Sequence, residues 1–427
     1  MFGTRAMTVA FASTLALAGC GDGNSPLPKF SVAVIGDMPY GASPTDTVEF
    51  NANPAFISAV NADSAVSMVL HTGDIHSGKE YCTQAYDESI AQQWAAFKSP
   101  LVYTPGDNEW MDCHKKKQGG GLYNAGTTNI DYVQVGGQDA GYMRGDPLAN
   151  LDLVRNTFFS SPGKTLGQTS LTVHTQAVEF DPAHDSDKKF VENVWFEKSG
   201  VLFATVNVPG GSNNGTFNWY GVPTMGVAQQ QEVAERTGAT LRWLDTVYAK
   251  AKAHGDTAMV IMVQGDMWDL DGNAMAYNGT LSELKQYIDK VASLTTSFGK
   301  PVLWINGDSH FYRSDNPLVK DAPCAVEVPS TPAGSKSTVT TTCANSVASG
   351  ALRSITAADP FTTVQDKTDP SFVPAYNAPN FHRLVVHGNA TASNTDKEYL
   401  RLTVDPSINA AVSENGFGPF SWVRVQP

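Results

Sequence analysis

Residues 66–77 read VSMVLHTGDIHS. The apolar run Val66–Leu70 predicts a short buried strand. The run ends at Gly73-Asp74, where a turn would place the carboxylate of Asp74 beyond the carboxyl end of that strand. In an open α/β sheet, ligands bind at this edge. The stretch therefore predicts a strand that delivers an acidic side chain to a site.

The same pattern, an apolar run followed by Gly-Asp, occurs at four other places in the chain. The other runs are Phe30–Ile35, Leu101–Thr104, Ala258–Val263 and Pro301–Ile305. The five carboxylates that follow are Asp37, Asp74, Asp107, Asp266 and Asp308. Three further Gly-Asp pairs, which begin at Gly21, Gly145 and Gly255, follow no such run. Carboxylates at one sheet edge repel each other unless cations lie between them, so the pattern predicts a metal site.

Length, composition and charge bound the class of protein. The 427 residues allow one large domain or two or three smaller ones. A hydrophobic content of 41% and a charged content of 17% are typical of a folded globular chain. The net charge of −13 argues against a nucleic-acid-binding face, which needs a basic stripe. It does not exclude an anionic substrate, because bound cations dominate the local field.

The N-terminus predicts export. Arg5 precedes the short apolar stretch Ala6–Ala18, and the quartet Leu17-Ala18-Gly19-Cys20 resembles the bacterial lipobox. We therefore expect a lipoprotein signal peptide at 1–19, lipidation of Cys20 and a tether at 20–29. This predicts a lipid anchor in the bacterial cell envelope, on the periplasmic or cell-surface side. The alternative is an ordinary secretory signal with a stray cysteine. No later run is apolar enough to span a bilayer.

Four cysteines remain after Cys20, an even number for an oxidising compartment. Three pairings are open to them. Cys82 follows Asp74 and Cys113 follows Asp107, so both are expected on loops that leave the same sheet edge. We therefore predict the disulfides Cys82–Cys113 and Cys324–Cys343.

Strands and helices alternate along the first hundred residues, which favours parallel strands with helical crossovers. We expect helices near 48–61, 85–98, 147–159, 229–253 and 281–294. The Gly-rich segment 118–146 is predicted to be a lid or binding loop, or disordered. Residues 319–369 are expected to form a long surface excursion, and 381–425 to contain antiparallel strands. The interpretation is a single catalytic domain over residues 30–427.

Taken in order, the carboxylate loops resemble the calcineurin-like metallophosphoesterase family. The family motifs are Asp-x-His, Gly-Asp, Gly-Asn-His-Asp/Glu, a lone His after a strand, and Gly-His-x-His. The corresponding segments here are Asp37-Met38-Pro39, Gly73-Asp74, Gly106-Asp107-Asn108-Glu109, Gln264-Gly265-Asp266 and Gly307-Asp308-Ser309-His310. The chain also resembles an exported, divergent subgroup with a Gly-Asp-Asn-Glu-Trp motif and a nearby Cys-His, here Cys113-His114. The resemblance implies an α/β fold, a β-sandwich of mixed sheets flanked by helices.

The resemblance also implies two divalent metal ions. Asp37, Asp74 and His310 would hold the first. Asp74 would bridge to the second, whose other ligands would be Asp107, Asp308 and either Gln264 or Asp266. The chain departs from the family because carboxylates replace several His and Asn ligands. This harder, more anionic set favours Mn²⁺, Mg²⁺ or Ca²⁺ over Zn²⁺ and argues against an iron–tyrosine redox centre.

Asn108 stands where the family has a histidine that assists catalysis. It could still donate a hydrogen bond to a phosphoryl oxygen. His76 and His114 are the nearest candidates for a general acid. Arg313 could clamp a phosphate, or it could pair with Asp315. The run Lys115–Lys117 lies near the rim and could steer anions, but a solvated loop is the preferred interpretation.

The predicted function is hydrolysis of a phosphorylated small molecule, a phosphomonoester or phosphodiester, by a metal-bound hydroxide. The first alternative is a binding or scaffold lipoprotein on the same fold with impaired catalysis. The second is a carbohydrate-active enzyme that uses paired carboxylates without metal. It ranks last, because five strand-end carboxylates exceed the pair that this chemistry requires.

Overall fold

The computed structural model describes residues 27–268, 280–319, 322–328, 337–342, 376–388 and 397–427. The predicted signal peptide, Cys20 and Cys343 lie outside these residues, as does most of the predicted excursion 319–369. Among the described residues, no helix combines the length and the apolar character that a membrane crossing requires.

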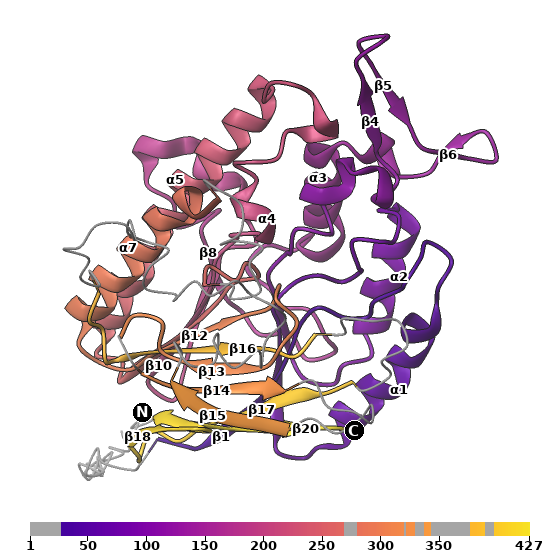
Figure 1. Ribbon diagram of the computed structural model, residues 1–427. Helices are drawn as coiled ribbons and strands as arrows, with labels where there is room; N and C mark the ends of the chain where they lie inside the picture. Colours follow the sequence, from indigo (N-terminus) through magenta and orange to yellow (C-terminus); the bar gives the residue numbers. More distant parts are fainter. Residues whose placement is uncertain (1–26, 269–279, 320–321, 329–336, 343–375, 389–396) are drawn as a thin grey trace, which may run out of the picture.

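Two mixed sheets form the centre of the molecule (Figure 1). The first has seven strands, in the order β18 (Ala410–Ser413), β19 (Gly416–Gly418), β20 (Phe420–Val425), β17 (Tyr399–Val404), β1 (Phe30–Ile35), β2 (Val66–His71) and β3 (Leu101–Tyr103). The second has nine, in the order β15 (Ser337–Thr342), β14 (Pro323–Val328), β13 (Arg313–Asp315), β16 (Phe381–Val385), β12 (Val302–Asn306), β11 (Ala258–Met262), β10 (Val201–Thr205), β9 (Val194–Lys198) and β8 (His174–Thr175). Within them, β1–β2–β3 and β10–β11–β12–β16 are parallel runs.

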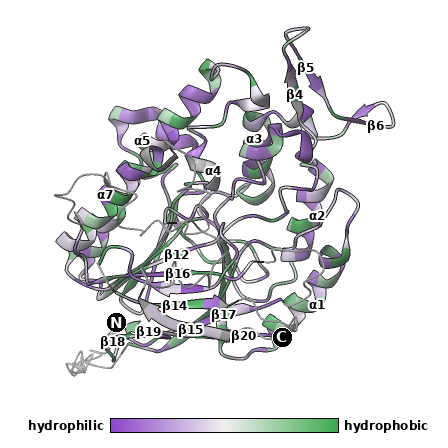
Figure 2. Cartoon of the chain, viewed as in Figure 1, coloured by the Kyte–Doolittle hydropathy of each residue, from purple (hydrophilic) through white to green (hydrophobic). Residues whose placement is uncertain are grey.

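The sheets pack face to face, and helices cover both outer faces. Alternate residues of β1 serve different layers, because successive side chains of a strand point to opposite faces. Val32 and Val34 join the core between the sheets, whereas Ala33 and Ile35 join the core beneath the first group of helices. That group is α1 (Val48–Ala62), α2 (Gln84–Trp94) and α3 (Pro147–Phe158). The second group, α5 (Val227–His254) and α7 (Thr280–Phe298), covers the nine-stranded sheet. In Figure 2 the helices alternate between hydrophobic and hydrophilic segments, as expected of helices with one buried side.

Two of the three Gly-Asp pairs that follow no apolar run serve as helix ends. Asp146 caps the N-terminus of α3, where its side chain accepts a hydrogen bond from the backbone N–H of Ala149. Gly255 ends α5 in the left-handed conformation, with φ of 78°. These roles distinguish both pairs from the Gly-Asp pairs of the strand ends. The third pair, at Gly21, lies outside the described residues.

The predicted α/β fold of two mixed sheets flanked by helices is confirmed. The segment 118–146 is ordered into two antiparallel ribbons that project from the body in Figure 1. They are β4 (Gly121–Asn124) with β5 (Asn129–Tyr132), and β6 (Gln134–Val135) with β7 (Gln138–Asp139). The described part of the predicted excursion is also different from expectation. Its strands β14 and β15 extend the nine-stranded sheet, and Cys324 and Val326 are buried.

Candidate metal centre

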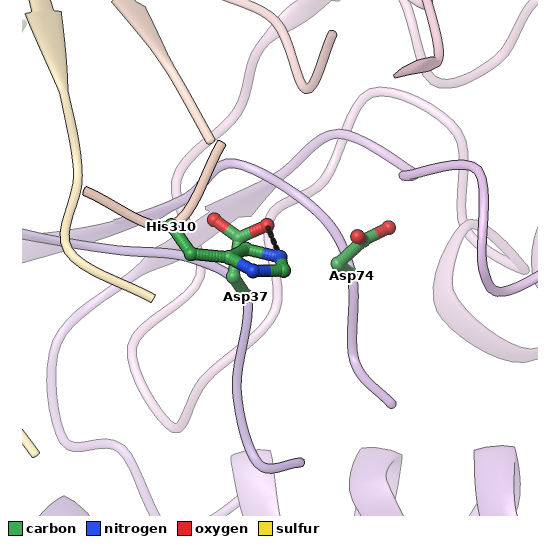
Figure 3. Close-up of side chains that lie close together, drawn as sticks. All are labelled: Asp37, Asp74 and His310. Atoms are coloured by element: carbon green, nitrogen blue, oxygen red, sulfur yellow. Dashed lines mark ion pairs between the residues drawn. The ribbon is translucent and has the colours of Figure 1, made fainter. Parts of the chain in front are cut away.

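Three loops bring Asp37, Asp74 and His310 together (Figure 3). Asp37 follows β1, Asp74 follows β2 and His310 follows β12. One donor atom from each lies within 4.8 Å of the other two, and His310 Nε2 is 3.5 Å from Asp37 Oδ1. Both aspartates are buried, whereas His310 is partly exposed. These are the three residues that the resemblance assigns to the first metal.

All three residues have left-handed backbone conformations, with φ of 52° at Asp37, 59° at Asp74 and 65° at His310. Such conformations cost non-glycine residues about 1–3 kcal/mol each and cluster at functional sites. Asp308, with φ of 74°, shares the feature. The turns therefore hold the donor groups in positions that ordinary strand ends would not supply.

Glycines let the loops approach the carboxylates closely. A Cβ at Gly106 would lie 2.0 Å from Asp74 Oδ1, and a Cβ at Gly307 would lie 2.3 Å from Asp37 Oδ2. No side chain larger than hydrogen fits at either position without movement. This explains why Gly precedes Asp107 and Asp308 in the strand-end motifs.

The donor set fits a divalent cation. Asp37 Oδ2 is buried and has no hydrogen-bond partner among the described residues. Burial raises the pKa of Asp37 and of Asp74 well above the usual range, and the neighbouring Asp107 carboxylate raises both further. A bound cation would remove this penalty, because it stabilises the ionised carboxylates.

Tyr40 belongs to the same cluster, although the sequence analysis did not select it. Its hydroxyl donates to Asp74 Oδ2 at 2.7 Å and lies 3.3 Å from His310 Nε2. Burial and the Asp74 charge raise the pKa of Tyr40 well above its usual value. The signal available in the sequence was its position three residues after Asp37, in the same loop.

The residues assigned to the second metal adjoin this cluster. The backbone N–H of Asp308 donates to Asp37 Oδ1 at 2.9 Å, and that of Asn108 donates to Asp74 Oδ1 at 3.3 Å. Gln264 Nε2 donates to Asp107 Oδ1 at 3.0 Å. The carboxylates of Asp107 and Asp308 are near enough to raise the pKa of Asp74. Neither belongs to the three-residue group of described residues whose donor atoms lie within 4.8 Å of one another.

Asp266 adjoins this group, since its backbone N–H donates to Asp308 Oδ2 at 2.9 Å, but its carboxylate is engaged by other side chains. Its Oδ1 is paired with Arg383, and its Oδ2 accepts a hydrogen bond from Ser309 Oγ at 2.7 Å. Of the two alternatives that the sequence left open, only Gln264 contacts Asp107. The Gln264 amide oxygen accepts from the backbone N–H of Gly210, so its amide group is fixed in place.

The two candidate histidines differ in position. His76 is fully buried, with its ring edge against Tyr86 and Nδ1 3.2 Å from the Ser77 carbonyl oxygen. Burial lowers its pKa to about 4, so the role of a general acid at His76 is not supported by its surroundings and stays a prediction. His114 lines a cavity together with Asp107 and Asp308.

His114 is neutral at pH 7, because burial and the adjacent Lys115 lower its pKa to about 3. Its Nδ1 accepts a hydrogen bond from the backbone N–H of Tyr220 at 2.9 Å. A neutral imidazole whose Nδ1 accepts carries its proton on Nε2. His114 can therefore donate a hydrogen bond, but it does not supply an imidazolium acid.

Asn108 does lie at the centre. Its Nδ2 donates to Asp74 Oδ2 at 2.9 Å. Glu109 beside it is buried and accepts hydrogen bonds from Ile75 N at 3.2 Å and from the Tyr103 hydroxyl at 2.8 Å. Glu109 therefore ties the loop after β3 to the loop that carries Asp74.

Arg313 does not reach the site. Its side chain is 3% exposed, and Nε is paired with the Asp315 carboxylate. Burial would raise the pKa of Asp315, but Arg313 and Arg383 hold it well below the usual range. The predicted phosphate clamp is wrong, and the alternative pairing with Asp315 is confirmed.

Two lysines, Lys115 and Lys116, line the same cavity as Asp107 and Asp308. Lys115 is partly buried and paired with Asp112, so its interpretation as part of a solvated loop is wrong. Lys117 is exposed and lines none of this cavity.

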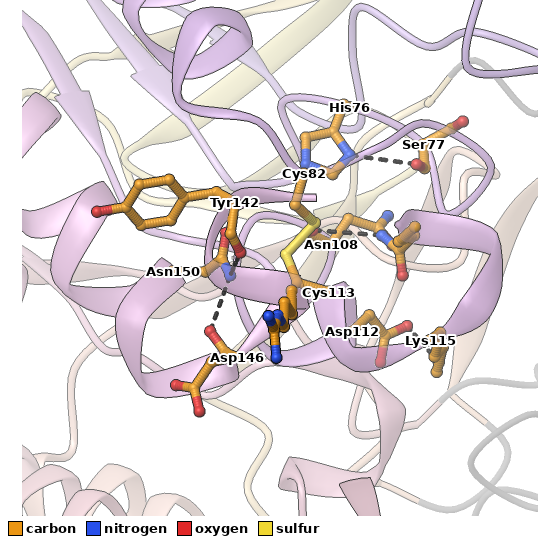
Figure 4. Close-up of a disulfide and its surroundings, with 12 residues drawn as sticks. His76, Ser77, Cys82, Asn108, Asp112, Cys113, Lys115, Tyr142, Asp146 and Asn150 are labelled. Carbon is orange, nitrogen blue, oxygen red and sulfur yellow. Dashed lines mark hydrogen bonds and ion pairs between the residues drawn. A yellow bond between two sulfur atoms is a disulfide. The ribbon is translucent and has the colours of Figure 1, made fainter. Parts of the chain in front are cut away.

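A disulfide joins Cys82 to Cys113, which confirms the first predicted pair (Figure 4). It links the loop after Asp74 to the loop after Asp107, and Asn108 lies beside it. The second predicted pair stays a prediction, since Cys343 lies outside the described residues.

The chain has similarities to known proteins at the level of a family model and of solved structures. A family model described as calcineurin-like phosphoesterase matches residues 30–241. A search of curated proteins gives no match. Among solved structures, a purple acid phosphatase from yellow lupin (Lupinus luteus) seeds is 11% identical, with a TM-score of 0.39, over 89% of this chain and 50% of that one. The chain thus spans about half the length of the lupin protein.

The two-sheet fold and the strand-end carboxylates define the chain as metallophosphoesterase-like. The family match over residues 30–241 identifies this part of the chain as calcineurin-like phosphoesterase. The resemblance drawn from the motifs is confirmed at the level of the family, and the exported subgroup stays a prediction.

Proposed function

We propose that the chain is a metal-dependent phosphoesterase that hydrolyses phosphomonoesters or phosphodiesters. The observation that carries the proposal is the convergence of Asp37, Asp74 and His310 within 4.8 Å, with one buried carboxylate oxygen lacking a partner among the described residues. Asp74, Asp107, Asp308 and Gln264 would hold a second cation. Bound divalent cations would lower the pKa of a water molecule and polarise phosphoryl oxygens.

The residues of the chain supply positioning and charge around the phosphoryl group. Asn108 has an amide donor beside Asp74, His114 has a neutral Nε2–H donor, and Lys115 has a positive charge in the adjoining cavity. None of these is a strong acid at pH 7. We therefore expect esters with good leaving groups to react fastest, because the leaving oxygen receives little help from proton transfer.

The carboxylate-rich donor set supports Mn²⁺, Mg²⁺ or Ca²⁺ over Zn²⁺. Export with a lipid anchor at Cys20 remains part of the proposal. The Cys82–Cys113 disulfide is in keeping with an oxidising compartment. The substrate would then be a phosphorylated small molecule outside the cytoplasm.

The test is metal analysis of the purified protein together with turnover of bis-(p-nitrophenyl) phosphate and p-nitrophenyl phosphate. We expect hydrolysis of at least one ester with Mn²⁺, and its loss with a chelator. Hydrolysis of these esters that survives chelation would indicate a metal-free chemistry and would overturn the proposal.

A second candidate function is a binding or scaffold protein on the same fold. It is favoured by Asn108, which stands at the catalytic histidine position and whose amide is engaged with Asp74. It predicts an intact fold that binds one metal ion or none, and no turnover with any divalent ion.

A further inference from the structure

A cavity of about 660 Å³ opens beside the second-metal carboxylates. Asp107 and Asp308 line one side of it. Cavities of this size are typical of small-molecule sites. If cations bind these carboxylates as proposed, an ester whose phosphate contacts the cations would place its organic group in this cavity.

Beyond the carboxylates the lining of the cavity is mixed, with the polar side chains of Lys116, Thr216 and Asn218 beside a group of apolar and aromatic side chains. That group contains side chains from the β4–β5 ribbon, from the segment around η5 (Trp219–Gly221) and from α7, namely Leu122, Phe217, Tyr220, Val222 and Leu284. Leu122 is 52% exposed, and Phe217 is 41% exposed. Exposed apolar side chains that gather on a cavity wall mark a surface available to an apolar ligand.

Tyr220 is fixed in this wall by contacts with two other segments. Its backbone N–H donates to His114 Nδ1 at 2.9 Å. Its ring meets the rings of His114 and Tyr132 edge to face, with centroids 5.7 Å and 5.8 Å apart. Because the ring is already held, an apolar ligand would lose little affinity to ordering this side chain.

The cavity therefore has two chemically different ends. Lys115 and the carboxylates form the charged end, where the proposed cations would lie, whereas Leu122, Phe217 and Tyr220 form the apolar part of the lining. A hydroxyl group placed against these three side chains would be left unpaired, at a cost in free energy. A flat hydrocarbon ring would bury apolar surface there without that cost.

We propose, on the basis of the proposed function, that this cavity selects phosphate esters whose organic group is an aromatic ring, held against Leu122 and Tyr220. The ribbon β4–β5 is then a specificity element of the site. It supplies Leu122 directly and supports Tyr220 through Tyr132.

The experiment uses two phosphonates that cannot be hydrolysed, phenylphosphonate and methylphosphonate. They share the charged group and differ in the organic group. Isothermal titration calorimetry of the full chain with Mn²⁺ is expected to give about tenfold tighter binding of phenylphosphonate, the effect of burying one ring face. Tyr220→Ala and Leu122→Ala should each reduce this preference to less than threefold and leave methylphosphonate binding unchanged.

Tyr123→Ala is the matched control, since Tyr123 lies on the same strand as Leu122 but lines none of the cavity. The inference is overturned if the wild-type chain binds both phosphonates equally or binds neither. It is also overturned if Tyr123→Ala removes the preference as strongly as Leu122→Ala. The preference together with no hydrolysis of any ester would instead overturn the proposed function and keep the inference.

Discussion

Gln118 holds Asn108 by two hydrogen bonds. Its Nε2 donates to the main-chain oxygen of Asn108 at 3.3 Å and to the side-chain Oδ1 at 3.2 Å. With its oxygen engaged, the Asn108 amide directs Nδ2 toward Asp74 Oδ2, 2.9 Å away. Gln118, at the start of the Gly-rich segment, is therefore a positioning residue for the metal centre.

Gln118→Ala is expected to lower kcat by about tenfold with little change in KM, because Asn108 loses its fixed orientation. Gln118→Glu keeps the shape but removes the donor, and should show the same loss. The measurement is steady-state kinetics with p-nitrophenyl phosphate, with the exposed Gln138→Ala as control. Full activity in Gln118→Glu would contradict the role of the donor.

Asp74→Asn is expected to abolish hydrolysis and to lower the bound metal from two ions per chain to one or none. The reason is that Asp74 lies between the two groups of candidate ligands. Plasma mass spectrometry of dialysed protein and the turnover assay measure both effects. Asp152→Asn, at an exposed position of α3, is the control. Unchanged metal content and rate would show that Asp74 is not a bridging ligand.

Tyr40→Phe removes the hydroxyl that donates to Asp74 Oδ2. A hydrogen bond to a charged group contributes about 1.5–3 kcal/mol, so the variant should bind Mn²⁺ at least tenfold more weakly. The change in affinity is measured by calorimetric titration with Mn²⁺ of protein from which a chelator has removed the metal. Tyr123→Phe should bind as the wild type does. Equal affinity in Tyr40→Phe would show that the hydroxyl plays no part in metal binding.

Lys115→Met should raise KM for a phosphate ester by about tenfold. Burial lowers the pKa of Lys115, but the Asp112 and Asp107 carboxylates raise it above the usual value, so the side chain is charged at pH 7. Lys117→Met, two residues away and outside the cavity, should leave KM unchanged. Equal effects of the two variants would indicate general attraction by surface charge.

Stability should fall on mild acidification, in part through His382. Burial lowers the pKa of His382 to about 4 in the folded chain, against about 6.5 when unfolded. Between these values the unfolded state binds a proton that the folded state does not. The contribution of neutral His382 to the free energy of unfolding is therefore complete above pH 6.5. It is lost as the pH falls toward 4, at up to about 1.4 kcal/mol per pH unit.

Urea unfolding at several pH values between 7 and 4.5 tests this dependence. His382→Gln should have a shallower dependence of unfolding free energy on pH than the wild type, whatever its stability at pH 7. His184→Gln, at an exposed position, should keep the wild-type slope. An unchanged slope in His382→Gln would show that this histidine is not the source.

The strand-end carboxylates could be predicted from sequence, because an apolar run followed by Gly-Asp is a local pattern. The predicted run Phe30–Ile35 has the same bounds as β1 in the structure. Helix α2 ends at Trp94, earlier than the end of the predicted helix at residue 98. Such ends depend on tertiary contacts that no local pattern contains.

Residues that act through distant partners could not be assigned in this way. The position of Arg313 after His310 suggested a phosphate ligand. In the structure β13 pairs with β16, and the Arg313 side chain is paired with Asp315 instead. Tyr40 joins the centre because the turn at Asp37 reverses the chain. His76 was placed by its distance from Asp74 along the chain, whereas the fold directs it into the core.

Strand β1, which delivers Asp37, lies between β2 and β17 and pairs with β17 from Phe30↔Val404 to Val34↔Leu400. The first ligand of the metal centre thus depends on a strand whose paired residues lie 366 to 374 positions later in the chain (Val34↔Leu400, Phe30↔Val404). In a growing chain in which β17 has not yet been synthesised, one edge of β1 has no partner strand. The metal centre can consequently assemble only late in folding, through contacts that are distant in sequence. Loss of the last strands would disturb the position of Asp37, although Asp37 lies near the N-terminus.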